Sequence, residues 1–124
     1  MEVAKEALIL FAHGSRDAQW AAPFRAVQKK IALARPGLRI ELAFLEIMQP
    51  SLPDAIDRLV AAGHVRLVIA PLFMAQGAHL KRDLAELLTS ARARHAHIEI
   101  VPLPAAGEAE AVLDAIGAWV TAHV

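Results

Sequence analysis

Three side chains of this sequence are of types that bind divalent metal ions, and each lies just beyond a strand-like segment. His13 directly follows the apolar run at residues 8–12, and Glu46 follows the segment at residues 39–44, in which polar and apolar residues alternate. His79 comes a short loop after the apolar run at residues 67–73. Neutral imidazole binds zinc, copper, iron, cobalt and nickel, while a carboxylate adds a ligand or holds an imidazole in one tautomer. These residue types therefore predict a metal site, if the fold brings the three together.

Other polar residues nearby suggest supporting roles. Asp83 lies four residues after His79, on the same face of a helix, where it could orient the imidazole. Ser15 is a good N-cap for the helix that follows, and Arg16 could bind an anion at that helix start. Each also has an ordinary interpretation, with Asp83 as an exposed helix charge, Arg16 as an exposed first-turn residue and Glu46 as a solvated loop acid.

Four strand-like segments alternate with four helical patterns along the chain. The runs at 8–12 and 67–73 are apolar throughout, which is typical of strands buried on both faces of a parallel sheet. The segments at 39–44 and 98–103 include charged residues, which is typical of edge strands. This alternation predicts an α/β fold of three layers, with a four-stranded parallel sheet between helices. Apolar residues recur at helical spacing at Trp20, Phe24, Val27 and Ile31, at Ile56, Leu59 and Val60, at Leu80, Leu84, Leu87 and Leu88, and at Val112, Ile116, Trp119 and Val120.

The order of the strands follows from the same patterns. The two fully apolar strands must be central, so right-handed crossovers give the order 2-1-3-4, the flavodoxin-like winding. The winding direction reverses between strands 1 and 3, where open α/β sheets bind their ligands. Neighbouring strands lie about 4.8 Å apart, and their carboxyl ends open on the same edge. We therefore expect His13, Glu46 and His79 to face one crevice.

Length and composition set further bounds. The 124 residues are predicted to form a single domain, 1–124, with a proper hydrophobic core. The 13 basic and 13 acidic residues balance, which argues against nucleic acid as a partner, and no segment is apolar enough to span a membrane. There is no cysteine, so we expect neither disulfides nor thiolate ligands, and a cytoplasmic location. Residues 1–6 are short and charged, unlike a signal peptide.

The remaining histidines are predicted to be ordinary. His64 follows a helix end, and His95 and His97 precede the fourth strand, which places all three on the opposite edge of the sheet from His13. His123 belongs to the C-terminal tail.

Three motifs together resemble a known family. They are His13-Gly14-Ser15-Arg16, Phe44-Leu45-Glu46, and the stretch Pro71-Leu72-Phe73-Met74-Ala75-Gln76-Gly77-Ala78-His79-Leu80-Lys81-Arg82-Asp83. Their combination and spacing resemble the class II tetrapyrrole chelatases, and most closely the short CbiX-type sirohydrochlorin chelatases, over nearly the whole chain. The longer members have two such domains where this chain has one, which implies a homodimer. A histidine-rich tail is absent from this sequence.

The resemblance implies a metal-inserting lyase. Such an enzyme inserts a divalent metal, most readily cobalt, then iron or nickel, into sirohydrochlorin during cobalamin or siroheme (porphyrin) biosynthesis. His13 and His79 would hold the metal and take up pyrrole protons, Glu46 would assist, and Ser15 and Arg16 would bind substrate carboxylates. Histidine accepts protons near neutral pH, and a site of imidazole and carboxylate without thiolate releases its metal. No phosphate-binding loop motif is present, so no nucleotide is expected.

Three alternatives use the same residues differently. A non-catalytic metal carrier would need the same side chains, and only an assay separates it from an enzyme. A phosphoryl-transfer enzyme with His13 as nucleophile would need an arginine before it, where this chain has Ala12. A flavodoxin-like binding module without chemistry would explain a lone histidine, which at a strand end is commonly just a hydrogen-bonded loop residue, but not the coincidence of His13, Glu46 and His79.

Overall fold

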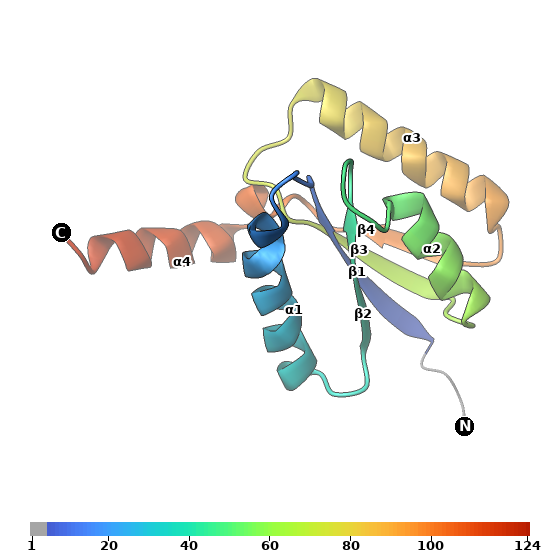
Figure 1. Ribbon diagram of the computed structural model, residues 1–124, viewed down its shortest axis with the longest axis horizontal. Coiled ribbons are helices and arrows are strands. Elements are labelled where there is room, and N and C mark those ends of the chain that lie inside the picture. Colours follow the sequence, from blue (N-terminus) through green and yellow to red (C-terminus); the bar gives the residue numbers. More distant parts are fainter. Residues whose placement is uncertain (1–4) are drawn as a thin grey trace.

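The computed structural model describes residues 5–124 and shows four parallel strands in one sheet. The strands are β1 (Glu6–Ala12), β2 (Arg39–Phe44), β3 (Arg66–Pro71) and β4 (Glu99–Pro102), and their order is β2-β1-β3-β4 (Figure 1). The predicted order is confirmed. Residues 1–4, which the domain and signal-peptide predictions include, lie outside the described residues.

The central place of β1 follows from its apolar side chains, which fill both faces of the sheet. Phe11 and Leu10 point to opposite faces, and both are at most 1% exposed. In the register of the sheet, Phe11 lies opposite Ala43 on one side and Pro71 on the other. The carboxyl ends of β1, β2 and β3 are therefore level at one edge.

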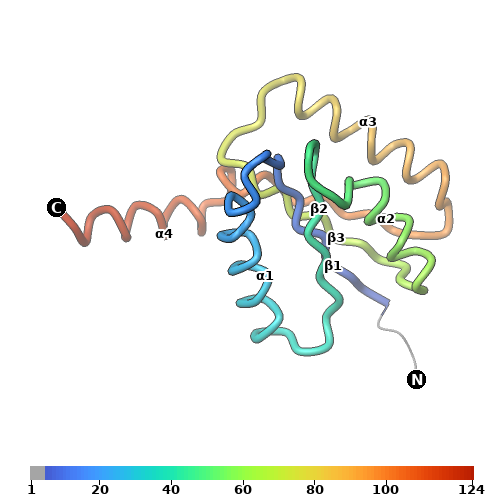
Figure 2. Tube along the Cα trace, viewed as in Figure 1, coloured from blue at the N-terminus to red at the C-terminus, as the bar shows by residue number. Residues whose placement is uncertain are grey.

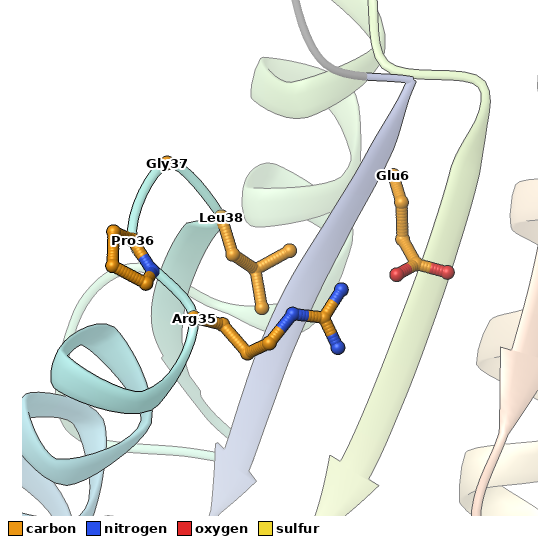
Figure 3. Close-up of a pocket in the computed structure, with 5 residues that line it drawn as sticks. All are labelled: Glu6, Arg35, Pro36, Gly37 and Leu38. Carbon is orange, nitrogen blue, oxygen red and sulfur yellow. The ribbon is translucent and has the colours of Figure 1, made fainter.

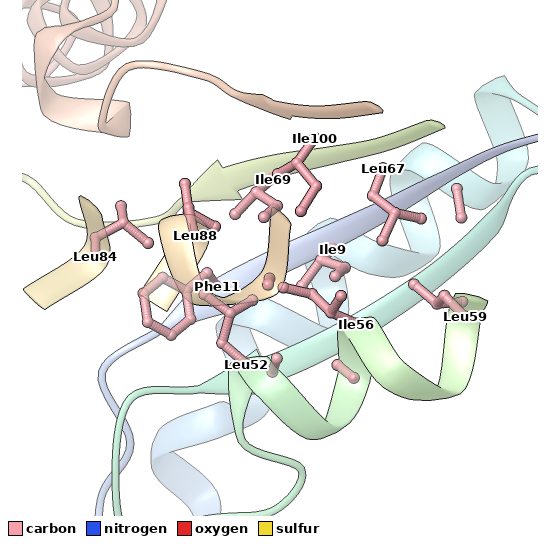
Figure 4. Packing of buried hydrophobic residues seen from close by; sticks show 14 of the residues in the cluster. Ile9, Phe11, Leu52, Ile56, Leu59, Leu67, Ile69, Leu84, Leu88 and Ile100 are labelled. Atoms are coloured by element: carbon pink, nitrogen blue, oxygen red, sulfur yellow. The ribbon is translucent and has the colours of Figure 1, made fainter. Parts of the chain in front are cut away.

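Two helices cover one face of this sheet and one helix covers the other. Helices α2 (Leu52–Ala61) and α3 (Ala78–Arg94) pack on the first face, and α1 (Ala22–Ala34) packs on the second (Figure 1). The core under α2 and α3 is the larger of the two, and Figure 4 shows its packing. Its labelled members are Ile9, Phe11, Leu52, Ile56, Leu59, Leu67, Ile69, Leu84, Leu88 and Ile100.

The expectation that Ser15 caps the first helix is wrong. A short 3-10 helix, η1 (Ala18–Ala21), precedes α1, and the carboxylate of Asp17 accepts from the Gln19 amide over 2.9 Å to cap it. The Ser15 hydroxyl instead accepts from the Asp17 amide over 3.1 Å. The extra helical turn moves the cap two residues along the chain.

The last helix, α4 (Glu110–Thr121), does not join either layer. It follows a second 3-10 helix, η2 (Ala106–Glu108), and extends away from the sheet (Figures 1 and 2). None of its residues is buried.

Across the described part of the chain, every helix falls short of the length and apolar character that a membrane crossing demands.

Candidate metal and tetrapyrrole site

His13 and Glu46 form a side-chain pair at the carboxyl ends of β1 and β2. The Nε2 atom of His13 lies 3.0 Å from Oε1 of Glu46. The side chains are 52% and 56% exposed, so a ligand approaching from solvent can reach both. When Glu46 accepts from Nε2–H, the Nδ1 lone pair of His13 is free to take a proton or a metal ion.

Gly14 allows the two backbones to come this close. Its φ of 103° lies in the left-handed region that favours glycine. A Cβ atom at this position would lie 1.9 Å from the carbonyl oxygen of Glu46. The sequence motif His-Gly therefore has a direct structural cause, since only glycine lets Glu46 approach the chain beside His13.

Ile47, directly after Glu46, holds a strained backbone. Its φ of 70° is rare for a β-branched residue, and the Met48 amide donates to the Glu46 carbonyl over 2.7 Å across this tight turn. The Ile47 side chain is 57% exposed. Strain of this kind gathers at functional sites, and nothing in the sequence pattern pointed to Ile47.

An aromatic residue, Phe73, lies beside His13, two residues after the end of β3. The rings of Phe73 and His13 lie edge to face with centroids 6.4 Å apart, and Phe73 also packs edge to face on Phe11. Phe73 is 8% exposed, so it forms an apolar wall behind the imidazole. This wall restricts how the ring of His13 can turn.

His79 lies farther along the chain than the strand end. It is the second residue of α3, after the loop at residues 72–77, and its side chain is exposed. Within residues 5–124, no three His, Asp or Glu side chains are arranged to share a metal ion. The structure thus pairs His13 with Glu46, and the joining of His79 to them stays a prediction.

Asp83 lines a hollow beside α3, one helical turn after His79. This hollow has a volume of about 360 Å³ and is lined by Leu45, Asp83, Glu86, Leu87 and Ser90. Among the described residues, Asp83 makes no hydrogen bond to His79. Leu45 precedes Glu46, so Asp83 adds a second carboxylate close to that end of β2.

The order of β1, β2 and β3, with His13 and Glu46 at their shared edge, can be compared with known proteins. The sequence matches the CbiX family over residues 7–122, which is nearly the whole chain. The chain belongs to the CbiX family.

Two curated relatives of this CbiX domain carry the same activity name. A protein of Methanococcus aeolicus named sirohydrochlorin cobaltochelatase is 34% identical over 83 residues, which cover 67% of this chain and 58% of the relative. A protein of Saccharolobus islandicus (strain L.S.2.15) with the same name is 37% identical over 83 residues, covering 65% of this chain and 62% of the relative. The aligned part of the chain thus spans about three fifths of these relatives.

Solved structures share the fold of this CbiX domain. The crystal structure of a CbiX protein from Marinobacter aquaeolei VT8 superposes with a TM-score of 0.81 and 27% identity, covering 95% of this chain and 93% of that one. The cobalt complex of the sirohydrochlorin chelatase SirB from Bacillus subtilis subspecies spizizenii superposes with a TM-score of 0.79 and 24% identity. This chain covers 50% of that SirB chain, so its fold corresponds to half of the larger protein.

Ser15 and Arg16 lie on the loop between β1 and η1. The Ser15 hydroxyl already accepts a backbone hydrogen bond, and Arg16 is exposed. The Gln19 amide in η1 donates to the Asp17 carboxylate, which competes with any anion from a substrate. Arg16 is therefore the better placed of the two to meet a carboxylate.

The other histidines of this CbiX domain lie away from the site. His95 Nε2 lies 2.7 Å from Oδ1 of Asp57, and Arg94 donates to the same oxygen over 3.1 Å, which ties α3 to α2. Hydrogen bonds from His95 and Arg94 hold the pKa of the Asp57 carboxyl below its ordinary value. His64 is buried, and His123 Nδ1 lies 2.9 Å from the Trp119 carbonyl oxygen.

A pocket at the opposite edge of the sheet is a poorer candidate. It lies at the amino ends of β1 and β2, has a volume of about 260 Å³ and is lined by Glu6, Arg35, Pro36, Gly37 and Leu38 (Figure 3). The guanidinium group of Arg35 extends toward Glu6 across it (Figure 3). The pocket holds no histidine, and open α/β sheets place their ligand sites at the carboxyl edge.

Proposed function

We propose that this chain inserts cobalt into sirohydrochlorin, with iron as the second metal. The observation that carries the proposal is the exposed His13–Glu46 pair, at the carboxyl ends of β1 and β2, in a member of the CbiX family. The relatives named sirohydrochlorin cobaltochelatase support the choice of metal and macrocycle.

The reaction replaces two pyrrole N–H protons by one divalent metal ion. A base beside the macrocycle must accept each proton as the metal–nitrogen bonds form. His13 can accept one proton at its free Nδ1, while Glu46 neutralises the imidazolium charge across 3.0 Å, and His79 is the proposed acceptor of the second proton. Imidazole and carboxylate also bind the incoming ion weakly enough to pass it on.

His79 is proposed as the third group of the site. It lies in the first turn of α3, whose N-cap residue, Gly77, makes no side-chain hydrogen bond to the helix. The loop at 72–77 connects β3 to this helix start, so the path of the loop determines how close His79 comes to His13. A ligand bound at the helix start would orient His79. Asp83, one turn later, would then orient the ring.

Substrate carboxylates need donors near this edge. The first amides of α3, left without a side-chain cap, carry the partial positive charge of a helix N-terminus. Lys81 and Arg82 add full charges in the same turn, and Arg16, with Ser15, supplies donors from the other side of His13. The exposed apolar side chains of Ile47 and Met74 are suited to contact the macrocycle.

Two further features belong to this proposal. One domain supplies a single wall for a flat macrocycle, so we propose a homodimer as the working unit. We also keep the cytoplasmic location as a prediction.

The decisive experiment is a metal panel with sirohydrochlorin, followed by the change in absorbance. We expect cobalt, and more slowly iron, to be inserted faster than in the uncatalysed reaction, without added nucleotide. A chain that binds cobalt but produces no rate above the uncatalysed one would be a metal carrier, and the proposal would fail.

A further inference from the structure

The chain crosses the edge of the sheet directly after β2, at residues 45–48. Leu45 packs against the core under α2 and α3, whereas Met48 packs against the core on the α1 side. Glu46 and Ile47 lie between these two anchors, and both are exposed. Because only two residues separate the anchors, the backbone must turn tightly between the two faces of the sheet.

Hydrogen bonds hold the backbone on both sides of this turn. The Glu46 amide donates to the His13 carbonyl oxygen over 3.1 Å, and the Met48 amide donates to the Glu46 carbonyl oxygen over 2.7 Å. The second bond closes a three-residue turn around Ile47, whose φ is 70°. The Glu46 carbonyl oxygen also packs against Gly14, where a Cβ atom would lie 1.9 Å from it. The position of Ile47 is therefore fixed by the fold.

Folding does not account for an isoleucine at this position. Positive φ is a genuine outlier for a β-branched residue, whereas glycine adopts such a turn without strain. The Ile47 side chain is 57% exposed and belongs to neither hydrophobic core of the described chain. Isoleucine thus strains the backbone here without gaining burial in return. Strain of this kind is typical of residues that contact a ligand.

A second exposed apolar residue lies on the other side of β1. In the strand order β2-β1-β3, Ile47 follows β2, His13 follows β1, and Met74 lies three residues after β3. Met74 is 60% exposed. Its backbone is held by Gly107, because a Cβ atom there would lie 1.5 Å from the Met74 carbonyl oxygen. Two apolar side chains on fixed backbones therefore follow the strands that flank the one ending at His13.

We propose that Ile47 determines the specificity of this site for a macrocyclic tetrapyrrole, by packing against the flat apolar face of the ring beside the His13–Glu46 pair. The inference rests on the proposed function and adds the residue that recognises the ring itself, as opposed to its carboxylates. The ring exposes carbon surface that ionic contacts do not desolvate. A stiff β-branched side chain on a fixed backbone loses little freedom on binding, so the strained turn prepares this contact in advance.

The chemistry of Ile47 limits what it can recognise. Its side chain has neither a donor nor an acceptor, so it contributes nothing to binding a metal ion, a proton or a carboxylate. Its contribution is confined to apolar surface. Cobalt binding in the absence of the macrocycle, measured by titration calorimetry, should therefore be the same in the wild type and in every variant at this position.

The first test is equilibrium dialysis of metal-free sirohydrochlorin against three variants. Ile47→Ala and Ile47→Gly remove the contact, so each should raise the dissociation constant about tenfold or more, as expected for an isoleucine side chain buried by the ring. Ile47→Val keeps the branch at Cβ and loses one methyl group, so the rise should be no more than about fourfold. Leu33→Ala removes another exposed apolar side chain, near the far end of α1, and should change nothing.

The second test is urea unfolding, which separates the strain from the contact. Ile47→Gly removes the Cβ atom that positive φ disfavours, so its unfolding midpoint should lie above that of the wild type. Ile47→Ala keeps a Cβ atom and should unfold at a lower urea concentration than Ile47→Gly. A merely structural residue would lower stability and ring affinity together, whereas Ile47→Gly should be more stable and bind the ring more weakly.

Three results would overturn the inference. They are an Ile47→Gly variant that binds the ring as tightly as the wild type, one that unfolds at a lower urea concentration, and one whose affinity for cobalt alone is reduced. Each of these can occur in a chain that inserts cobalt at the normal rate, so the proposed function would survive. Conversely, ring binding that depends on Ile47 in a chain without insertion activity would support the inference while the proposed function fails.

Discussion

His13 and Glu46 are joined twice, once through their backbones and once through their side chains. The Glu46 amide donates to the His13 carbonyl oxygen over 3.1 Å, and the side-chain atoms Nε2 and Oε1 lie 3.0 Å apart. The backbone bond extends the pairing of β1 with β2 past the last residue of each strand. This backbone hydrogen bond therefore holds the two residues in place at the edge of the sheet, although both side chains are exposed to solvent.

Replacing either member of this pair should slow metal insertion and leave the fold intact. We expect His13→Ala, and to a lesser degree Glu46→Gln, to lower kcat by about 100-fold or more, the usual contribution of a positioned base. The thermal midpoint should hardly change, because both side chains are exposed. Cobalt insertion followed by absorbance measures the effect, and His97→Ala on a distant exposed loop is the control. Full activity in His13→Ala would remove that residue from the site.

His79→Ala tests the third proposed group separately. We expect a large loss of cobalt insertion with unchanged helicity, since His79 is exposed in the first turn of α3. The matched variant Lys81→Ala should mainly raise KM, because a lysine there binds substrate carboxylates and accepts no proton. Equal effects of both variants on KM alone would mean that His79 only binds substrate.

Gly14→Ala should both destabilise the chain and separate His13 from Glu46. The new Cβ meets the Glu46 carbonyl oxygen at 1.9 Å, and the φ of 103° strains any other residue. We expect the free energy of unfolding to fall by about 2 kcal/mol or more, with activity lost in parallel. Gly37→Ala isolates the backbone strain, because its φ is 89° but no atom lies within 4 Å of its Cβ position. It should cost only about 1 kcal/mol and keep full activity, as urea unfolding would show.

Gly107 is not part of the loop at 72–77 that leads to His79, but Gly107→Ala should disturb that loop. Gly107 donates to the Phe73 carbonyl over 2.9 Å, and a Cβ there would lie 1.5 Å from the carbonyl oxygen of Met74. The loop must shift, so we expect a lower kcat/KM for metal insertion. Gly77→Ala, in the same loop but with open space around its Cβ position, should change kcat/KM little. If both variants act alike, the loop is sensitive to glycine loss in general and not to this contact.

Asp57 should make stability fall at acid pH. Its pKa is lowered in the folded chain by the hydrogen bond with His95 and the contacts with Arg94. The stabilisation is therefore present above the unfolded pKa, near 3.8, and is lost as the pH falls through the lower folded pKa. Asp57→Asn should be less stable than wild type at pH 7, by less than about 1 kcal/mol for an exposed pair, and the gap should close at low pH. Urea unfolding at both pH values measures this, with Glu86→Gln as control. A gap that stays constant would show that Asp57 acts through packing.

Local patterns in the sequence were enough to predict the sheet. An unbroken apolar run indicates a strand that is buried on both faces, so the runs at residues 8–12 and 67–73 predicted β1 and β3 to be the central strands. The winding rules then determined the order 2-1-3-4 without any tertiary information. They also brought His13 and Glu46 to neighbouring strand ends, because parallel strands share the direction of their carboxyl ends.

Tertiary structure alone decided the details beyond the strand ends. Whether His79 meets His13 depends on the path of the loop at 72–77, and loop paths leave no periodic signal. The strained turn at Ile47 and the cap at Asp17 in place of Ser15 are set by local geometry that residue types only bias. The apolar spacing at residues 112–120 predicted a helix there, but it could not show that this helix, α4, extends away from the sheet with no buried residue, because the same spacing is typical of a helix packed on its own core.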